Sequence, residues 1–328
     1  MESNVEKAQE PIDLDTLDGR LKVSKECTSG SFDVFKSVME SMAAKFTPEY
    51  LEELSKISYD DDRTYPENFS NWYNHIINFG CFAHADIIAN QIFTFEDTKI
   101  IKKTDDYKKV DWESINEILK PTLDKMEKYK VYNIKNGCFS NKFDFETSLA
   151  TKDTLAQQLW KINYQSSMLD TGGFTELVVR ELIPYNNSEI PTIYNGMPMR
   201  EEIRVFYNMD RNIVEYVEDY WKYKYCANNI RNKSDKIVFD WFHNKLKTRK
   251  IQHREKIKEL TDFIYNNIGT LKFDGALKGI WSIDFMWVEE TNKLYLIDMA
   301  RGFRSAYWNI DKLTYKSYLQ IQEERKNK

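Results

Sequence analysis

Residues 281–288 have the sequence Trp-Ser-Ile-Asp-Phe-Met-Trp-Val, and residues 294–298 have the sequence Leu-Tyr-Leu-Ile-Asp. Both stretches are rich in the β-branched, aromatic and other apolar residues that favour strands. The polar residues 289–293 lie between them and predict a turn. The sequence therefore predicts an antiparallel hairpin that carries one aspartate on each strand, Asp284 on the first and Asp298 on the second.

The two aspartates of this hairpin each follow an isoleucine, Ile283 or Ile297. Because neighbouring residues of a strand point to opposite faces, we expect the aspartates to share one face and the isoleucines the other. Two carboxylates opposite each other repel unless a cation lies between them. Oxygen ligands of this kind suit Mg²⁺, which keeps waters and bridges substrate phosphates. We therefore predict a metal site at Asp284 and Asp298; the plainer alternative is two exposed aspartates on an edge hairpin.

Two lysines lie beside a short turn upstream of the hairpin. The predicted strand 130–135 ends at Lys135, the turn 136–140 follows, and Lys142 lies just beyond it. Lysine next to backbone N–H donors is what a chain of phosphates needs. Both lysines are thus candidates for phosphate binding, and the alternative is that they are ordinary surface lysines.

Two other predicted strands carry charges within apolar sequence. Residues 176–183 predict a buried strand, and Arg180 and Glu181 interrupt it. Arg204 interrupts the first strand of a second predicted hairpin in the same way. Such a charge marks an edge position, a site residue or an internal ion pair, which Arg204 could form with Glu181 or Glu202.

The composition excludes several classes of protein. Only 11 of the 328 residues are glycine, and no set of them fits G-x-G-x-x-G or G-x-x-x-x-G-K-[ST], so the standard dinucleotide and Walker-type loops are absent. The net charge of −5 disfavours a nucleic-acid binder. The polar N-terminus is unlike a signal peptide, and no apolar run approaches the ~20 residues of a membrane helix. Four widely spaced cysteines fit a reducing cytoplasm, so we expect a cytoplasmic protein with no membrane or nucleic-acid partner.

The pattern along the chain predicts an α+β protein with a polar N-terminal arm. Residues 1–30 predict the flexible arm, and residues 31–129 predict an N-terminal α+β region. The elements predicted from periodicity and capping are helices within 32–56, a strand at 91–95, a helix at 110–129, a helix at 151–168, a hairpin at 202–219, a helical stretch at 234–268 capped by Gly269, and a charged helical tail at 311–328.

The order of these features resembles that of the ATP-grasp superfamily over residues 130–301, about half of the chain. Members of this superfamily hold ATP between two α+β lobes built on antiparallel sheets. The resemblance implies an ATP-grasp core at 130–328, in which 130–183 is the first lobe and 184–310 is the second lobe with the metal hairpin. Residues 311–328 would be a C-terminal helix, and 31–129 the substrate or partner side.

The resemblance also implies a role for each candidate residue, with ATP and Mg²⁺ as cofactors. The implied cofactor-binding residues are Lys135, Gly137 and Ser140 at the phosphates, Arg180, Glu181 and Leu182 at the adenine hinge, and Arg204. Arg204 and Lys142 are the implied catalytic residues. Asp284 and Asp298 are the implied metal ligands.

Within the superfamily, the chain is most similar to the cell-division-cycle type of ATP-grasp chaperone, which assembles eukaryotic translation initiation factor two. The motifs Glu-Leu-Val-x-Arg, Glu-Phe-Arg-x-Phe and Leu-Ile-Asp-Phe-Asn of that type resemble residues 176–180, 202–206 and 296–299. One departure is Ala300, which stands where the superfamily usually has a third metal ligand. The resemblance therefore implies that one metal ligand is either missing or supplied from elsewhere in the chain, with Arg301 or Arg304 available to neutralise phosphate charge.

The resemblance implies two functions from different classes. The first is an ATP-dependent carboxylate–amine or peptide ligase, in which a carboxylate attacks the γ-phosphate to give an acyl phosphate and ADP, and an amine then displaces phosphate. The alternative is an ATP-binding assembly factor or chaperone for a protein client, without ligase chemistry. The implied partners are ATP with either a small-molecule or peptide acceptor or a protein client. Nothing in the sequence selects a third class, an effector that modifies a host protein.

Overall fold

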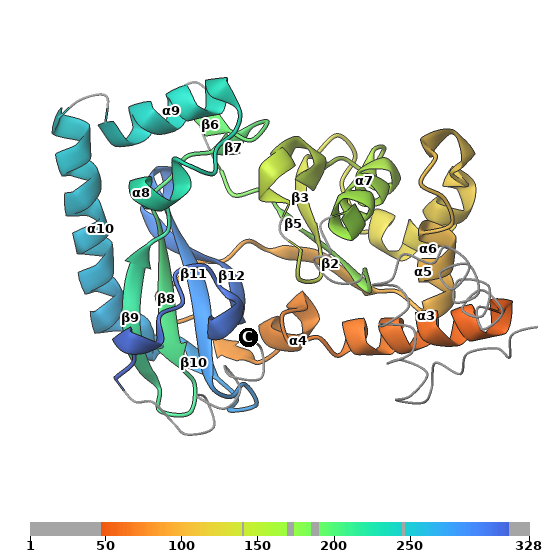
Figure 1. Ribbon diagram of the computed structural model, residues 1–328, viewed down its shortest axis with the longest axis horizontal. Coiled ribbons are helices and arrows are strands. Elements are labelled where there is room, and N and C mark those ends of the chain that lie inside the picture. Colours follow the sequence, from red (N-terminus) through yellow and green to blue (C-terminus); the bar gives the residue numbers. More distant parts are fainter. Residues whose placement is uncertain (1–46, 140, 169–173, 185–189, 245–246, 315–328) are drawn as a thin grey trace, which may run out of the picture. The chain divides into compact units, whose positions relative to one another are not determined.

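The structure is a computed structural model that describes residues 47–139, 141–168, 174–184, 190–244 and 247–314. The chain divides into two compact units, residues 1–60 and 61–328. Helix α3 (Pro48–Arg63) begins in the first unit, and every other element named below lies in the second (Figure 1). No described helix is both long enough and apolar enough to cross a bilayer.

The first four-stranded sheet is antiparallel throughout and has the order β2–β5–β3–β4. Its strands are β2 (Ile87–Ile92), β5 (Glu176–Glu181), β3 (Tyr132–Asn136) and β4 (Leu149–Ala150). The inner strand β5 is apolar on both faces because both are covered. Leu177 and Val179 pack into a core with helices α6 (Trp112–Leu123) and α7 (Leu155–Met168), whereas Val178 belongs to the core of the second sheet.

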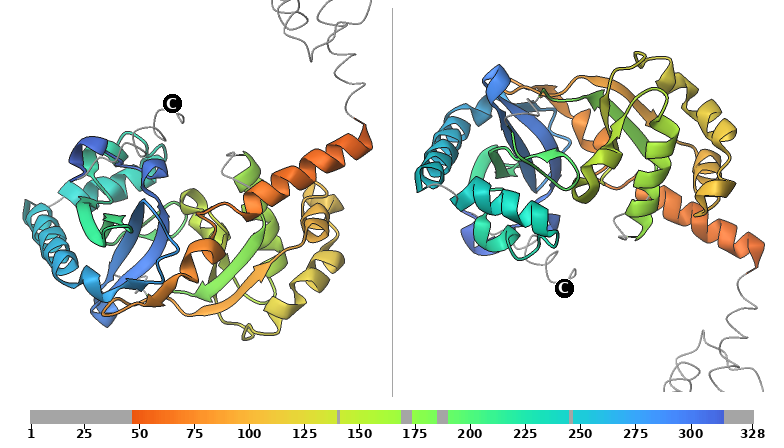
Figure 2. Two further views of the ribbon diagram at one scale, coloured as in Figure 1. Left: turned by 90° about the horizontal axis from the view of Figure 1, so that it is seen from below. Right: turned by 90° about the horizontal axis from the view of Figure 1, so that it is seen from above.

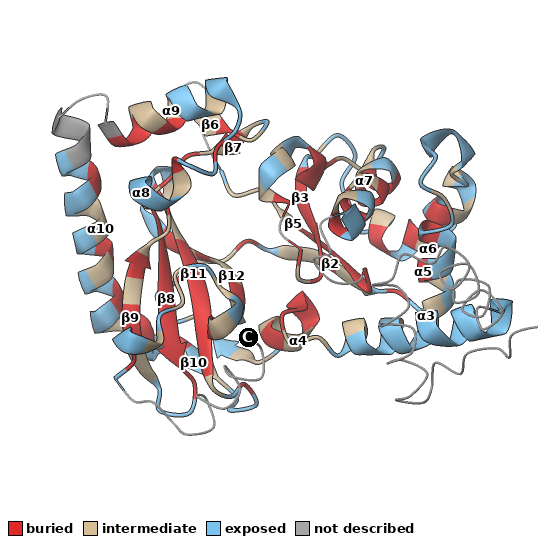
Figure 3. Ribbon diagram, in the orientation of Figure 1, coloured by how far each residue is buried: buried red, intermediate tan, exposed pale blue. Residues whose placement is uncertain are grey.

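The second four-stranded sheet is also antiparallel and has the order β12–β11–β8–β9. Its strands are β8 (Glu202–Asn208), β9 (Ile213–Asp219), β11 (Ile280–Val288) and β12 (Lys293–Arg301). The long helix α10 (Lys247–Asn267) lies along one face of this sheet (Figures 1 and 2). Leu260 and Ile264 of that helix pack against Ile203 and Phe285 in the core. The inner strands of both sheets are therefore the most buried parts of the unit (Figure 3).

Shorter elements connect and cover the two sheets. They are α4 (Phe69–Tyr73), α5 (Phe95–Ile101), α8 (Tyr223–Cys226), α9 (Lys233–Asn244), the paired strands β1 (Ile76–Asn78) and β10 (Lys272–Phe273), and the paired strands β6 (Thr192–Ile193) and β7 (Met197–Pro198). Helical turns of the 3₁₀ type lie at Tyr107–Lys109, Lys142–Ser148, Ile268–Thr270, Glu289–Thr291, Gly302–Arg304 and Ile310–Lys312.

The predicted α+β class and antiparallel sheets are confirmed. The hairpins predicted at 202–219 and 281–298 are present as β8–β9 and β11–β12. The strand predicted at 91–95 is misplaced, because β2 ends at Ile92 and the side chain of Thr94 caps α5.

The single helical stretch predicted over 234–268 is wrong in its continuity, because α9 and α10 are separate helices. The helix predicted at 110–129 is shorter than expected, since α6 ends at Leu123. The arm at 1–30, the first helix predicted after it and residues 315–328 of the tail lie outside the described residues.

Candidate functional site

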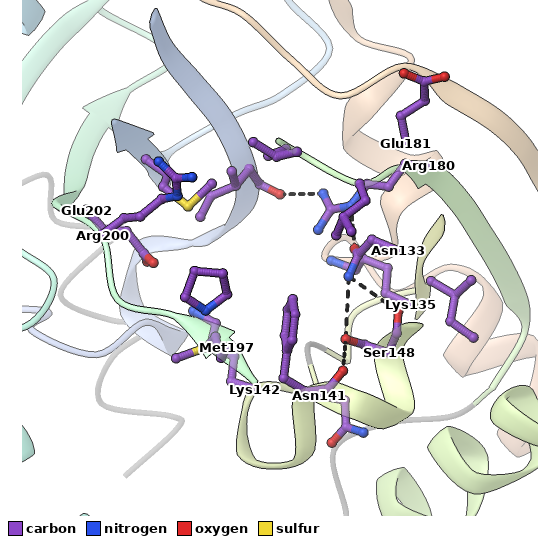
Figure 4. Close-up of a pocket in the computed structure, with 17 residues that line it drawn as sticks. Asn133, Lys135, Asn141, Lys142, Ser148, Arg180, Glu181, Met197, Arg200 and Glu202 are labelled. Atoms are coloured by element: carbon purple, nitrogen blue, oxygen red, sulfur yellow. Dashed lines mark hydrogen bonds between the residues drawn. The ribbon is translucent and has the colours of Figure 1, made fainter. Parts of the chain in front are cut away.

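A cavity of about 120 Å³ lies where residues of the two sheets meet (Figure 4). Its walls come from β3, the helical turns Lys142–Ser148, the end of β5, and the second sheet with the segment that leads into it. The lining residues are Asn133, Ile134, Lys135, Asn141, Lys142, Phe145, Ser148, Arg180, Glu181, Leu182, Ile183, Met197, Pro198, Arg200, Glu202, Met286 and Ile297.

Arg180 joins the two sheets at this cavity. Its Nε donates a hydrogen bond to Oδ1 of Asn133 at 2.8 Å, and its Nη1 donates to the backbone oxygen of Ile297 at 2.9 Å. The first partner lies on β3 and the second on β12. The charge that interrupts the apolar strand β5 therefore links the sheets, and Figure 4 shows both bonds as dashed lines.

The predicted adenine hinge lies at the end of β5. The ladder of β5 ends at Glu181, whereas Leu182 and Ile183 continue along the cavity wall outside it. The carboxylate of Glu181 accepts a hydrogen bond from Lys130 at 2.6 Å and points away from the cavity (Figure 4). The backbone of Glu181 can therefore contribute to the cavity wall, whereas its side chain forms an ion pair with Lys130.

Lys135 and Asp298 form an ion pair across the two sheets. The Nζ of Lys135 lies 2.9 Å from Oδ1 of Asp298, and only 4% of the lysine is exposed. Burial works to raise the pKa of Asp298, but the charge and hydrogen bond of Lys135 outweigh it and hold the pKa below its ordinary value. Lys135 is thus a buried residue, and the alternative of a surface lysine is wrong.

Arg204 and Asp284 form a second ion pair beside the first. The guanidinium holds the carboxylate in two hydrogen bonds of 2.7 and 2.8 Å, and it also donates to the backbone oxygen of Ala306 at 3.1 Å. Burial opposes the charge of Arg204, but Asp284 outweighs it and raises the arginine pKa. The alternative of an internal ion pair is correct in kind, although the partner is Asp284 rather than Glu181 or Glu202.

Lys142 and Glu202 are two further charged residues of the cavity wall. The Nζ of Lys142 donates a hydrogen bond to the phenolic oxygen of Tyr220. Burial works to lower the pKa of Lys142, but Tyr220 and the carboxylates of Glu202 and Asp284 outweigh it and raise the pKa. Burial raises the pKa of Glu202 to about 7, and the nearby charge of Asp284 adds to that rise.

Asp284 and Asp298 lie directly opposite each other in the β11–β12 ladder, so the prediction that they share a face is confirmed. The prediction that Ile283 and Ile297 share the other face is wrong. The register shifts after Asp284, so that Ile283 pairs with Met299 in the core and Ile297 lies in the cavity wall. A bulge of this kind re-aims side chains next to a site. Asp284 is also buried, which excludes the alternative of an exposed aspartate there.

The turn 137–139 follows β3, and its residues are not among those that line the cavity. The amide of Phe139 donates to the oxygen of Asn136 at 2.8 Å, and Gly137 has φ of +34°. A Cβ at Gly137 would lie 2.4 Å from Oδ1 of Asn68, so a side chain does not fit there. Burial raises the pKa of Cys138 to about 11, which makes this thiol a poor nucleophile. The predicted site residue Ser140 lies outside the described residues.

Arg200 and Asn133 are cavity residues that the sequence did not single out. Arg200 is buried, donates to both carboxylate oxygens of Glu290 at 2.8 and 2.9 Å, and donates to the oxygen of Pro184 at 2.8 Å. It thereby fixes the end of the hinge against the second sheet. The run of charges at 200–202 before an apolar strand was the available signal, since buried charges need partners.

The two arginines that follow Ala300 do not line the cavity. Arg301 is bonded to the buried carboxylate of Glu67 at 2.7 Å, and Arg304 lies 4.8 Å from the ring of Tyr65. Ala300 pairs with Ser282, whose hydroxyl lies 2.5 Å from that of Ser305. The groups near Ala300 thus include the hydroxyls of Ser282 and Ser305 and the carboxylate of Glu67, which accepts a hydrogen bond from the backbone amide of Arg301 at 3.3 Å.

Of the predicted residues, Lys135, Lys142, Arg180, Glu181 and Leu182 line the cavity, whereas Gly137, Arg204, Asp284 and Asp298 are not among its lining residues. Asp298 reaches the cavity wall through its contact with Lys135, and Arg204 and Asp284 are paired with each other. Within the part of the chain that the structure describes, no three histidine, cysteine, aspartate or glutamate side chains are grouped as metal ligands, and each of the two aspartates holds a cationic side chain.

Comparison with known proteins gives a structural likeness alone. No protein-family model and no curated protein sequence matches this chain. The fold is similar to the structure of Cdc123 from Schizosaccharomyces pombe, with a TM-score of 0.41 and 14% identity over 81% of this chain and 92% of that one. A C-terminally truncated form of the same protein gives a TM-score of 0.41 and 14% identity over 78% and 89% of the two chains.

Proposed function

We propose that this protein binds ATP together with Mg²⁺ in the cavity between its two sheets. The observation that carries the proposal is a pair of ion pairs next to a cavity whose wall also carries apolar side chains: Lys135 of the wall with Asp298, and Arg204 with Asp284, which faces Asp298 across the hairpin. A ligand with an apolar ring at one end and several negative charges at the other matches this distribution.

The apolar part of the cavity suits a purine ring. Ile134, Leu182, Ile183, Met286 and Ile297 supply its walls. Leu182 and Ile183 lie beyond the end of the β5 ladder, so their backbone groups are outside the sheet's own hydrogen bonding. Backbone N–H and C=O groups at such an edge are the usual means of orienting a small ligand within an apolar pocket.

The charged part of the cavity suits the triphosphate and its metal. Asp284 and Asp298 face each other on one side of the hairpin, and carboxylate oxygens with phosphate oxygens are the ligands that Mg²⁺ takes. When bound, the ion would neutralise phosphate charge. Lys135 and Arg204 would hold phosphate oxygens, and Lys142 lines the same cavity as Lys135.

For the biological role, we propose an ATP-binding assembly factor that acts on a protein client, in preference to a ligase. The specific support is that alanine stands at position 300, where the superfamily usually has a third ligand, and that Arg301 and Arg304 contact Glu67 and Tyr65. The ligase stays the second candidate because the cations needed to steady a transferring phosphoryl group are present.

Isothermal titration with ATP, with and without Mg²⁺, tests the nucleotide part of the proposal. We expect binding to one site, weakened at least tenfold by Asp298→Asn or Arg204→Met, because each change removes one metal ligand or one phosphate partner. Glu127→Gln is a matched control, since that carboxylate pairs with Lys130 outside the cavity wall. Equal affinity in the wild type and both site variants would contradict the assignment.

The biological role is tested by measuring whether ATP causes retention of a protein client or formation of an amide product. An assembly factor retains one protein client in an ATP-dependent pull-down, and the Asp298→Asn variant loses it. A ligase releases ADP in proportion to an added acceptor and yields a product of new amide mass. A new amide product that depends on Asp298 would overturn the assembly-factor role and leave ATP binding standing.

A further inference from the structure

Tyr220 lies directly after β9 and contacts two cationic residues of the site. The Nζ of Lys142 donates to its hydroxyl and lies 4.1 Å from the ring centroid, and the guanidinium carbon of Arg204 lies 4.8 Å from the same centroid. Lys142 follows the turn after β3, and Arg204 belongs to β8. One aromatic ring therefore holds two cations from distant parts of the sequence.

The position of the Tyr220 ring is itself fixed by several contacts. Its backbone amide donates to the oxygen of Glu202 at 2.9 Å, and its backbone oxygen accepts from the hydroxyl of Tyr307 at 2.6 Å. The indole of Trp221 packs edge to face on the ring at 5.1 Å. A ring with so many restraints can set the positions of the groups that lie on it.

Lys142 depends on this ring more than Arg204 does. Within the described parts of the chain, Tyr220 is its one hydrogen-bond partner, and no carboxylate lies within ion-pair distance of its Nζ. An ammonium group carries three donors, so this lysine keeps capacity for further acceptors. Arg204, by contrast, is bonded to Asp284 and to the oxygen of Ala306.

The ring also reduces the repulsion between the two cations. The negative face of an aromatic ring attracts a cation placed over it. Without the ring, a lysine and an arginine at one place would push each other apart, and the mobile lysine side chain would leave first. Lys142 lines the cavity, and the ring joins it to Arg204, which is paired with Asp284 on the neighbouring strand.

We propose that Tyr220 is a positioning residue that holds Lys142 and Arg204 for the terminal phosphate of bound ATP, so that the protein distinguishes ATP from ADP. This inference rests on the proposed ATP binding and names the part of the nucleotide that these residues recognise. Tyr220 acts through the two cations, and the terminal phosphate is the group that they contact together.

The test is the ratio of the dissociation constants for ADP and ATP, measured by titration calorimetry in Mg²⁺. Tyr220→Leu removes the ring and the hydroxyl, so ATP affinity falls about tenfold while ADP affinity falls less than about threefold. Tyr220→Phe keeps the ring and loses only the bond to Lys142, so it gives a smaller change in the same direction. Lys142→Met lowers the ratio too, and adding Tyr220→Phe to it has little further effect.

A matched control is Tyr225→Leu. That ring is 53% exposed and contacts Tyr307 at 4.9 Å rather than Lys142 or Arg204, so the ratio stays at its wild-type value. Equal losses of ATP and ADP affinity in the Tyr220 variants would show a merely structural residue and overturn the inference. If Tyr220→Leu does not fold, the test rests on Tyr220→Phe and Lys142→Met, measured singly and together. Additive effects of these two substitutions on the ratio of the dissociation constants would overturn the inference. Failure of the wild type to bind ATP overturns the proposed function as well.

Discussion

Lys135 and Asp298 show how single residues of this site depend on each other. Lys135 belongs to the first sheet and Asp298 to the second. The Nζ of Lys135 lies 2.9 Å from Oδ1 of Asp298, and the lysine is only 4% exposed to solvent. An ion pair removed from water is not strongly stabilising by itself, but loss of one partner leaves the other charge buried without compensation. Under the proposed function, the pair is two ligand-binding groups that neutralise each other until ATP binds.

At this residue scale, we predict that substitutions of Asp298 and Lys135 lower the free energy of unfolding by unequal amounts. Asp298→Asn lowers the free energy of unfolding by about 3 kcal/mol, because it leaves the Lys135 ammonium buried and unpaired. Lys135→Met costs less, since Asp298 is partly exposed and keeps the charges of Lys142 and Arg180 nearby. The double variant recovers part of the loss, which urea unfolding of all four proteins measures. Strictly additive losses would show that the two residues are not coupled.

At the scale of elements, the junction of β9, α9 and α10 contains two buried histidines whose pKa values are shifted in opposite directions. The Nε2 of His253 on α10 lies 3.0 Å from Oδ2 of Asp219, and its Nδ1 lies 3.7 Å from Oε1 of Glu201. Burial works to lower the pKa of His253, but the hydrogen bond to Asp219 and the negative charges of Asp219 and Glu201 outweigh it and raise the pKa to about 9. His243 of α9 lies with its ring 5.2 Å away, and burial together with the charge of His253 lowers its pKa to about 4.

This junction predicts a stability that is highest near pH 6.5, the ordinary histidine pKa. Below pH 6.5, His243 binds more protons in the unfolded chain than in the folded protein, because its pKa is lowered on folding. Its contribution to stability is therefore lost as the pH falls from 6.5 towards about 4. The raised pKa of His253 adds stability that is complete below pH 6.5 and is lost as pH rises towards about 9. Relative to the wild type, His243→Phe flattens the acid side of the unfolding profile and His253→Gln the alkaline side. Parallel profiles for all three proteins would contradict these pKa directions.

The elements also show what the sequence could predict and what it could not. The alternation of apolar residues around Asp284 and Asp298 was enough to predict a hairpin with facing aspartates, because strand geometry has a period of two. The bulge at Ile297 had no signal in that alternation, and it moved an expected core residue into the cavity. The role of Arg200 depends on Glu290, which lies 90 residues away in sequence, so local pattern could not reveal it.

At the scale of the whole second unit, site residues are also the contacts that join its sheets. Lys135 and Arg180 of the first sheet bond to Asp298 and the Ile297 oxygen of the second, and Glu67 before α4 bonds to Arg301 at the end of β12. If ATP binds as proposed, moving Lys135 from Asp298 to a phosphate changes a contact between the sheets, whereas Arg204 and Asp284 belong to the same sheet. The proposed ATP binding would thus be coupled to the arrangement of the sheets through Lys135 and Asp298.

The most direct test of this account is a structure of the protein with Mg²⁺ and a non-hydrolysable ATP analogue. We predict the base against Leu182, Ile183 and Met286, the metal bound by Asp284 and Asp298, and the Nζ of Lys135 moved from Asp298 to a phosphate oxygen. A complex in which Lys135 keeps its 2.9 Å contact with Asp298 while the nucleotide lies elsewhere would contradict the account.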